Sequence, residues 1–323
     1  MDANLRILLS LCYPSLRTAE RSVSLKCRRI YFGQSTEIEN VTYRVDMFHG
    51  DEGSDHHVES HGPRHHDQDV VLPGGVEHVT RMTIDYGSCK QILRIKHTSS
   101  IHTPQEYINT ILFGKRIVPI QTLYIGIAQA TPVLRFPPGV SFQTKDLETM
   151  KDSPEHLVEL GKILDASSCP LDILVIHHRE GRLELESQDF VRGAEQLLIS
   201  NYAGGENVFD MLLSMPNKEV EVYFITNDTV RRSLPIIIES WIRNEREIGT
   251  CYKLRCLPVK PKFNFLKRRF ATQTVDDSSF IIPLNTHSNI MISRGDEDSN
   301  LGRNLIDLYF LTIEVVALVH ITD

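Results

Sequence analysis

Short apolar segments recur along this chain at nearly constant spacing, and this repetition limits its possible folds more than any other feature. The segments have strand character and are centred near Leu93, Tyr124, Leu174, Leu198, Tyr223 and Lys253. Their centres lie 31, 50, 24, 25 and 30 residues apart, and the step of 50 fits two units if an irregular one is centred near Leu147. Such periods are typical of strand–helix repeats, which bury their apolar faces by stacking on their neighbours.

Helices are expected between most of these strands. Thr103 to Glu106 has the form of a capping box, and further helices are expected over 153–164, 208–215 and 229–247. Pro235 either kinks the last helix or marks its start. The pattern predicts an α/β fold, namely an irregular leucine-rich-repeat-like strand–helix solenoid with short N-terminal helices and a C-terminal β-rich part. The alternative is a single doubly wound sheet.

Changes in composition divide the chain into four parts. Residues 1–47 hold N-terminal helices and a hairpin of Cys27–Gly33 with Val41–Met47. Residues 48–80 form a histidine-rich acidic loop with too little apolar surface to offset the cost of ordering it. Residues 81–257 carry the repeats, and residues 258–323 alternate polar turns with short apolar strands.

The histidines of the acidic loop raise the question of a metal site. His56, His57, His61, His65 and His66 include pairs at helical spacing. Gly62 and Pro63 interrupt that helix, and the neighbouring acids define no coordination geometry. We therefore expect no structural or catalytic metal and no cofactor.

Composition also narrows the class of protein. Apolar residues make up 41% of the chain, enough for a core, and the formal charge of −7 argues against a general nucleic-acid binder. The chain shows neither a convincing signal peptide nor an apolar run that could cross a membrane. Its six cysteines are expected to be reduced thiols. We expect a protein of the cytoplasm or nucleus that is not secreted.

No enzymatic signature occurs in the sequence. It lacks a phosphate-binding loop, a dinucleotide fingerprint, a zinc-protease motif and a nucleophile elbow. His177 and His178 follow a strand, where acid–base groups could lie, but no nucleophile or orienting partner accompanies them. We therefore expect a protein that is not an enzyme.

Several stretches resemble a nematode-expanded family of unknown function that is related to F-box and F-box-associated proteins. They are the opening DANLRILLSLCYPSLRTAERSVSLKCRRIYFG with the NVTYRV strand, LPGGVEH (72–78), YINTILFGKRIVPIQTLYIG (107–126) and LRFPPGVSFQTKDLETM (134–150). The resemblance implies a protein-interaction protein that recruits substrates for ubiquitin ligation through a Skp1-type adaptor. Relatives carry a further helical segment upstream of this stretch, so the resemblance implies that residues 1–47 are an F-box-like remnant. Either the adaptor-binding element is lost, or the sequence is truncated at its start.

Binding is expected at exposed strand ends, because a solenoid presents its partner surface along one side. The residues expected there are Gln121, Tyr124, His177, His178, Asn201 and Tyr202. The alternative is nucleic-acid binding through residues 260–270, where lysines and arginines alternate with Phe263, Phe265 and Phe270. We favour an amphipathic strand for this segment, with Phe263 and Phe265 buried on one side.

Overall fold

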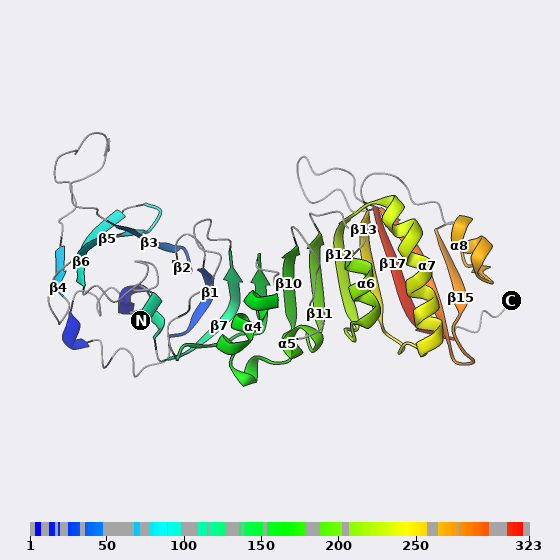
Figure 1. Ribbon diagram of the computed structural model, residues 1–323, viewed down its shortest axis with the longest axis horizontal. Coiled ribbons are helices and arrows are strands. Elements are labelled where there is room, and N and C mark those ends of the chain that lie inside the picture. The colour runs from blue at the N-terminus through cyan, green and yellow to red at the C-terminus, as the bar shows by residue number, and fades with distance from the viewer. Residues whose placement is uncertain are drawn as a thin grey trace. The chain divides into compact units, whose positions relative to one another are not determined.

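The fold was analysed in a computed structural model (Figure 1). The described residues are 4–7, 13–16, 19, 25–32, 36–47, 68–71, 78–88, 90–97, 109–110, 112–114, 116–126, 136, 139–150, 154–178, 188–201, 207–256, 264–276, 278–296 and 309–318. They form two compact units. Unit 1 comprises Met1–Glu148 and Glu159–Ser168, and unit 2 comprises Thr149–Val158 and Cys169–Asp323.

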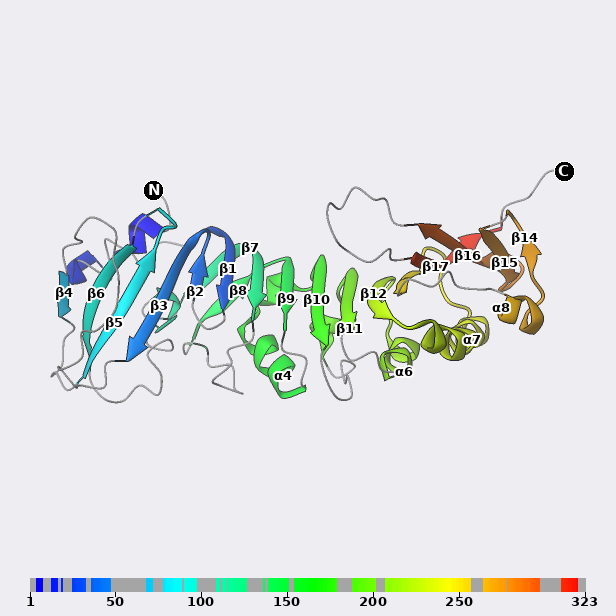
Figure 2. The same ribbon diagram turned by 90° about the horizontal axis from the view of Figure 1, so that it is seen from above.

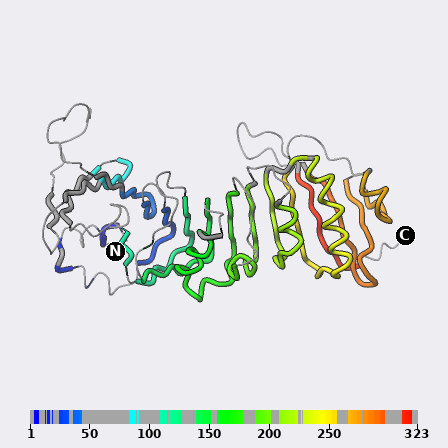
Figure 3. Tube along the Cα trace, in the orientation of Figure 1, coloured from blue at the N-terminus to red at the C-terminus, as the bar shows by residue number. Residues whose placement is uncertain are grey.

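Unit 2 is built on a mixed β-sheet. Its strands are β10 (Ile173–His178), β11 (Gln196–Asn201), β12 (Glu219–Ile225), β13 (Cys251–Cys256), β14 (Gln273–Thr274), β15 (Ser279–Pro283), β16 (Ser288–Asp296) and β17 (Tyr309–Ala317). Strands β10 to β13 pair in parallel in chain order. Strand β17 pairs antiparallel with both β13 and β16, and β15 and β14 follow antiparallel (Figure 3, where β17 is red).

Helices connect the parallel strands of unit 2. They are α5 (Asp189–Arg192), α6 (Asn207–Ser214) and α7 (Asn227–Asn244), and α8 (Asn264–Arg269) follows β13. Thr226 caps α7 by accepting a hydrogen bond from the backbone N–H of Thr229. Helices α6 and α7 lie on the same face of the sheet (Figure 2). That face contains the core, which includes Trp241 of α7 and Tyr252 of β13.

Unit 1 contains a second mixed arrangement of strands. They are β1 (Cys27–Phe32), β2 (Thr36–Ile38), β3 (Val41–Met47), β4 (Gln68–Val71), β5 (His78–Asp85), β6 (Lys90–His97), β7 (Ile117–Ile125), β8 (Ser141–Gln143) and β9 (Asp146–Thr149). Pairing runs in the order β4, β6, β5, β3, β2, β1, β7, and β7 then pairs with β8 and β9. Helix α4 (Pro154–Ile163) follows β9 in the chain. Short 3-10 turns occur at Pro14–Leu16 and Ala166–Ser168.

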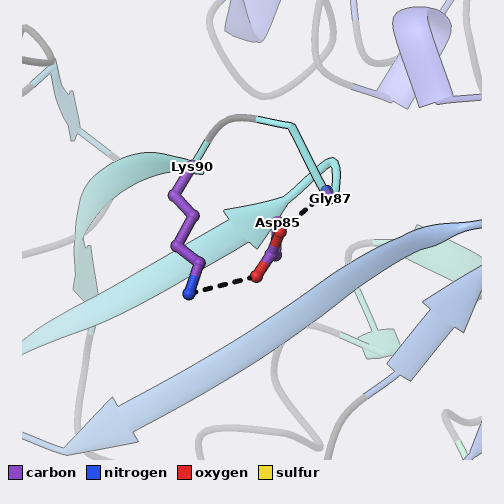
Figure 4. Close-up of polar contacts among 3 residues, drawn as sticks. All are labelled: Asp85, Gly87 and Lys90. Carbon is purple, nitrogen blue, oxygen red and sulfur yellow. Dashed lines mark hydrogen bonds and ion pairs between the residues drawn. The ribbon is translucent and has the colours of Figure 1, made fainter. Parts of the chain in front are cut away.

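The turn between β5 and β6 shows how local sequence fixes this pairing (Figure 4). The backbone N–H of Gly87 donates to Asp85 Oδ1 at 2.8 Å, and Lys90 Nζ lies 3.3 Å from Asp85 Oδ2. Gly87 has a φ of 79°, which glycine adopts without steric cost. The Gly87 hydrogen bond, supported by Lys90, lowers the pKa of the Asp85 carboxyl.

The predicted leucine-rich-repeat-like solenoid is wrong. The described chain consists mostly of mixed β-sheet with few helices, and after β13 the sheet of unit 2 continues through antiparallel strands. A solenoid would instead add another parallel strand and helix at each step. The pairing of β13 with β17 connects segments more than fifty residues apart, which the local period cannot reveal.

Individual elements were predicted with more success. The helices expected over 153–164, 208–215 and 229–247 correspond to α4, α6 and α7, and Pro235 lies inside α7. The strand expected near Phe265 is instead helix α8. The hairpin expected within residues 1–47 contains an extra strand, β2, which pairs with both β1 and β3. Strand β4 lies within the segment predicted as a loop, whose residues 48–67 lie outside the described part.

Candidate functional site

The sheet of unit 2 has one face directed at helices and one directed away from them. Tyr252 of β13 points to the helices, because its hydroxyl lies 3.4 Å from the backbone carbonyl oxygen of Leu212 in α6 and its ring centre lies 4.9 Å from that of Trp241 in α7. Side chains alternate along a strand, so Lys253 and Arg255 point to the opposite face. We call this the open face, since none of the described helices covers it (Figure 2).

Strand register places an aromatic and cationic row across the open face. Ser200 of β11 pairs with Tyr223 of β12, and Arg255 of β13 pairs with Phe310 of β17. Phe310 pairs in turn with Gly295 of β16. Between Tyr223 and Arg255 the register of β12 and β13 is irregular, and these two residues meet through the contact of the guanidinium with the ring. We call Ser200, Tyr223, Arg255, Phe310 and Gly295 the central row.

Two contacts hold Arg255 in the centre of this row. Its guanidinium lies 4.8 Å from the centre of the Tyr223 ring, and it forms an ion pair and a hydrogen bond with the carboxylate of Glu221. The Glu221 side chain is only 9% exposed and that of Arg255 is 23% exposed. The cation is therefore fixed over an aromatic ring.

Gly295 makes room for the aromatic ring at the other end of the row. A Cβ atom built at this position would overlap three carbon atoms of the Phe310 ring. The ring therefore lies directly over the Gly295 backbone, where it covers part of strand β16. The glycine is required by this close approach and not by a positive φ.

The residues beside the central row vary in charge. Lys253 is exposed, whereas Cys251 is half-buried and pairs with Glu314 of β17. Burial raises the pKa of the Cys251 thiol, and the nearby Glu314 carboxylate adds to this effect. A thiol with a raised pKa is a poor nucleophile at neutral pH, so Cys251 is suited to packing.

The predicted histidine pair is divided between the two faces of the sheet. His178 is buried on the helix side with Leu174 and Ile176, whereas His177 alternates onto the open face beside Ser200. The two imidazoles therefore point away from each other. Asn201 pairs with His178 at the end of β11, and Tyr202 lies outside the described residues.

Gln121 and Tyr124, the remaining predicted residues, belong to β7 of unit 1. The Gln121 side chain is exposed, and its backbone carbonyl accepts a hydrogen bond from the Thr144 hydroxyl at 2.9 Å. The Tyr124 ring stacks on Tyr31 with 4.7 Å between ring centres. Arg29 lies 5.9 Å from the centre of the Tyr124 ring. This aromatic pair thus forms a separate feature of unit 1.

Two further features are absent from the part of the chain that the structure describes, a metal-binding cluster and a membrane-crossing helix. Within those residues, no group of three or more His, Cys, Asp or Glu side chains is arranged to hold a metal ion. The histidine cluster at residues 56–66 lies outside them. No helix among the described residues is long and apolar enough to cross a membrane.

One part of the chain matches a known family model. A family model described as a domain of unknown function (DUF3557) matches residues 100–256, which include β7 and the four parallel strands of unit 2. Neither the curated proteins nor the solved structures gave a match. The matched range contains Tyr223, Glu221 and Arg255, whereas Phe310 and Gly295 lie beyond it.

Proposed function

We propose that this chain is a non-catalytic recognition protein that binds a protein partner through the open face of unit 2. The observation that carries the proposal is the Arg255 guanidinium held over Tyr223 by Glu221 on a helix-free sheet face. Tyrosine and arginine are enriched among the residues that dominate protein–protein binding energy. Fixing them in advance reduces the entropy lost on binding.

The neighbouring side chains suit the same role. Phe310 extends the row over Gly295 and adds apolar area, while exposed Lys253 supplies a charge near the centre of the face. Protein interfaces typically combine an aromatic and arginine core with a polar surround. His177 and His178 point to opposite faces, so the two imidazoles do not meet beside the row.

Site-specific crosslinking tests this proposal. A photoreactive amino acid placed at Lys253 should crosslink a discrete protein in a cell extract, whereas the same group at exposed Arg192 of α5 should not. Phe310→Ala should abolish the crosslink from position 253 while the fluorescence of Trp241 shows that unit 2 is folded. The same species captured from both positions, or a crosslink that survives Phe310→Ala, would refute binding through the open face.

A finer form of the proposal concerns ubiquitin ligation. The resemblance to F-box-associated proteins supports a cytoplasmic or nuclear role in which the bound partner is a substrate and a Skp1-type adaptor binds residues 1–30. The full chain should then co-purify with the adaptor, and a chain lacking residues 1–30 should not. If the folded full chain fails to associate, the ubiquitin-ligase form is refuted, while recognition through the open face remains testable by crosslinking.

A further inference from the structure

Unit 2 carries a concentration of positive charge on its helical side, away from the open face. The exposed cations of α7 and α8 are Arg231, Arg232, Arg243, Lys267, Arg268 and Arg269. We call these six residues the basic ridge. Helix α7 contains two acidic residues, Asp228 and Glu239, and α8 contains none. The ridge therefore stands out in a chain whose formal charge is −7.

The two helices of the basic ridge are fastened to each other and to the sheet. The Arg269 guanidinium binds Glu239 Oε1 through two nitrogen atoms, at 2.8 and 2.7 Å. Lys267 Nζ lies 5.7 Å from the centre of the Phe280 ring in β15. Leu266, which directly precedes Lys267 in α8, is fully buried. These contacts hold α8 against α7 and the sheet.

An apolar side chain interrupts the cations on α7. Ile236 is 49% exposed although its neighbours Ile237 and Ile238 are buried. It lies four residues after Arg232 and seven before Arg243, so all three share one stripe of the helix. At 1.5 Å per residue, the stripe from Arg232 to Arg243 is about 16 Å long.

We propose that the basic ridge is a second binding surface, for an acidic polypeptide segment that carries one apolar side chain. Carboxylates of such a segment would pair with the arginines at the two ends of the stripe, and its apolar side chain would cover Ile236. Arginine binds carboxylates in a planar two-point geometry, which favours its use here.

A single-stranded nucleic acid is the competing occupant of a basic surface. Nucleic acids bound without sequence preference stack their bases on exposed aromatic rings. Within the described parts of α7 and α8, Trp241 is buried and Phe265 is half-buried. An exposed isoleucine between arginines fits a peptide better than a row of phosphates, so the observations favour the peptide.

Binding of a synthetic peptide tests the inference directly. The probe is a fluorescent peptide of glutamate and aspartate with one central leucine, and fluorescence anisotropy with the full chain measures its affinity at low ionic strength. Arg232→Glu combined with Arg243→Glu should weaken binding about a hundredfold, since attraction turns into repulsion at two positions. Arg192→Glu combined with Lys218→Glu makes the same change of charge elsewhere on unit 2 and should leave the affinity within about twofold.

The apolar contact needs its own measurement. Ile236→Ser should weaken binding of the leucine peptide by about fivefold and leave binding of an all-acidic peptide unchanged. Equal loss in both charge-reversed variants, or no effect of Ile236→Ser, would overturn the proposal. It would also be overturned if an oligothymidine of equal charge bound more tightly than the peptide, which would assign the ridge to nucleic acid.

Discussion

Removing the cation of the central row is the sharpest test of how unit 2 is held together. Arg255→Met keeps most of the aliphatic stem but leaves the Glu221 carboxylate, which is 9% exposed, without its ion-pair partner. Breaking a fully buried pair from one side costs roughly 3–5 kcal/mol. Because Arg255 is 23% exposed, water can reach part of the vacated site. We therefore expect a smaller loss of about 2 kcal/mol.

Urea unfolding followed by tryptophan fluorescence measures this loss. Trp241 is the single tryptophan of the chain and packs against Tyr252 in unit 2, so its emission follows that unit. With an m-value of about 2 kcal/mol per molar urea, a loss of 2 kcal/mol lowers the midpoint by about 1 M. The m-value itself should not change.

A double variant separates the charge effect from lost packing. Glu221→Gln in the Arg255→Met background removes the unpaired carboxylate. It should restore about 1 kcal/mol of the free energy of unfolding. A midpoint for Arg255→Met within about 0.2 M of the wild-type value, or no gain in the double variant, would refute the argument that the row is held by this ion pair.

Three other perturbations test separate parts of unit 2. Hydrogen bonds from Ser278 lower the pKa of Asp276 from 3.8 to about 2, so the stability that this carboxylate adds is present above pH 4 and is lost as the pH falls towards 2. In Asp276→Asn the urea midpoint should change less between pH 4 and pH 2 than it does in the wild type. An unchanged pH dependence would contradict the stabilising role of the Asp276 carboxylate. Gly295→Ala should lower the free energy of unfolding by about 2 kcal/mol, because the added methyl group displaces the Phe310 ring. Adding Phe310→Leu to this variant should restore part of the lost free energy, as measured by urea unfolding. Burial raises the pKa of the Tyr252 phenol and also that of Tyr31, so spectrophotometric titration should show tyrosines ionising above pH 10, and Tyr252→Phe should reduce the amplitude of that step by one tyrosine.

Local periodicity was sufficient to place many single elements. In β12, the valines of EVEVYFI alternate with Glu219, Glu221 and Tyr223, and this period of two identifies both the strand and its outward side. Helix α7 follows from apolar residues at helical spacing, although it begins at Asn227, two residues before the expected start, and its cap is Thr226. The same alternation could have indicated Tyr223 and Glu221 as candidate site residues.

Lateral pairing could not be read from the same patterns. Arg255 and Phe310 meet because β17 pairs with β13, and nothing in either segment specifies its neighbour. Helix α8 was mistaken for a strand because phenylalanines alternate with polar residues at its start, while Leu266 and the following cations fit one short helical turn equally well. Patterns of five or six residues do not distinguish these two structures.

The internal position of β17 has a consequence for synthesis. This strand lies between β13 and β16, yet it is made after both of them. Until it emerges from the ribosome, the growing chain exposes two unsatisfied strand edges that can pair with other chains. Translation that stops before residue 309 should therefore yield aggregation-prone fragments, and nascent chains of this length are the stage at which chaperone protection matters most.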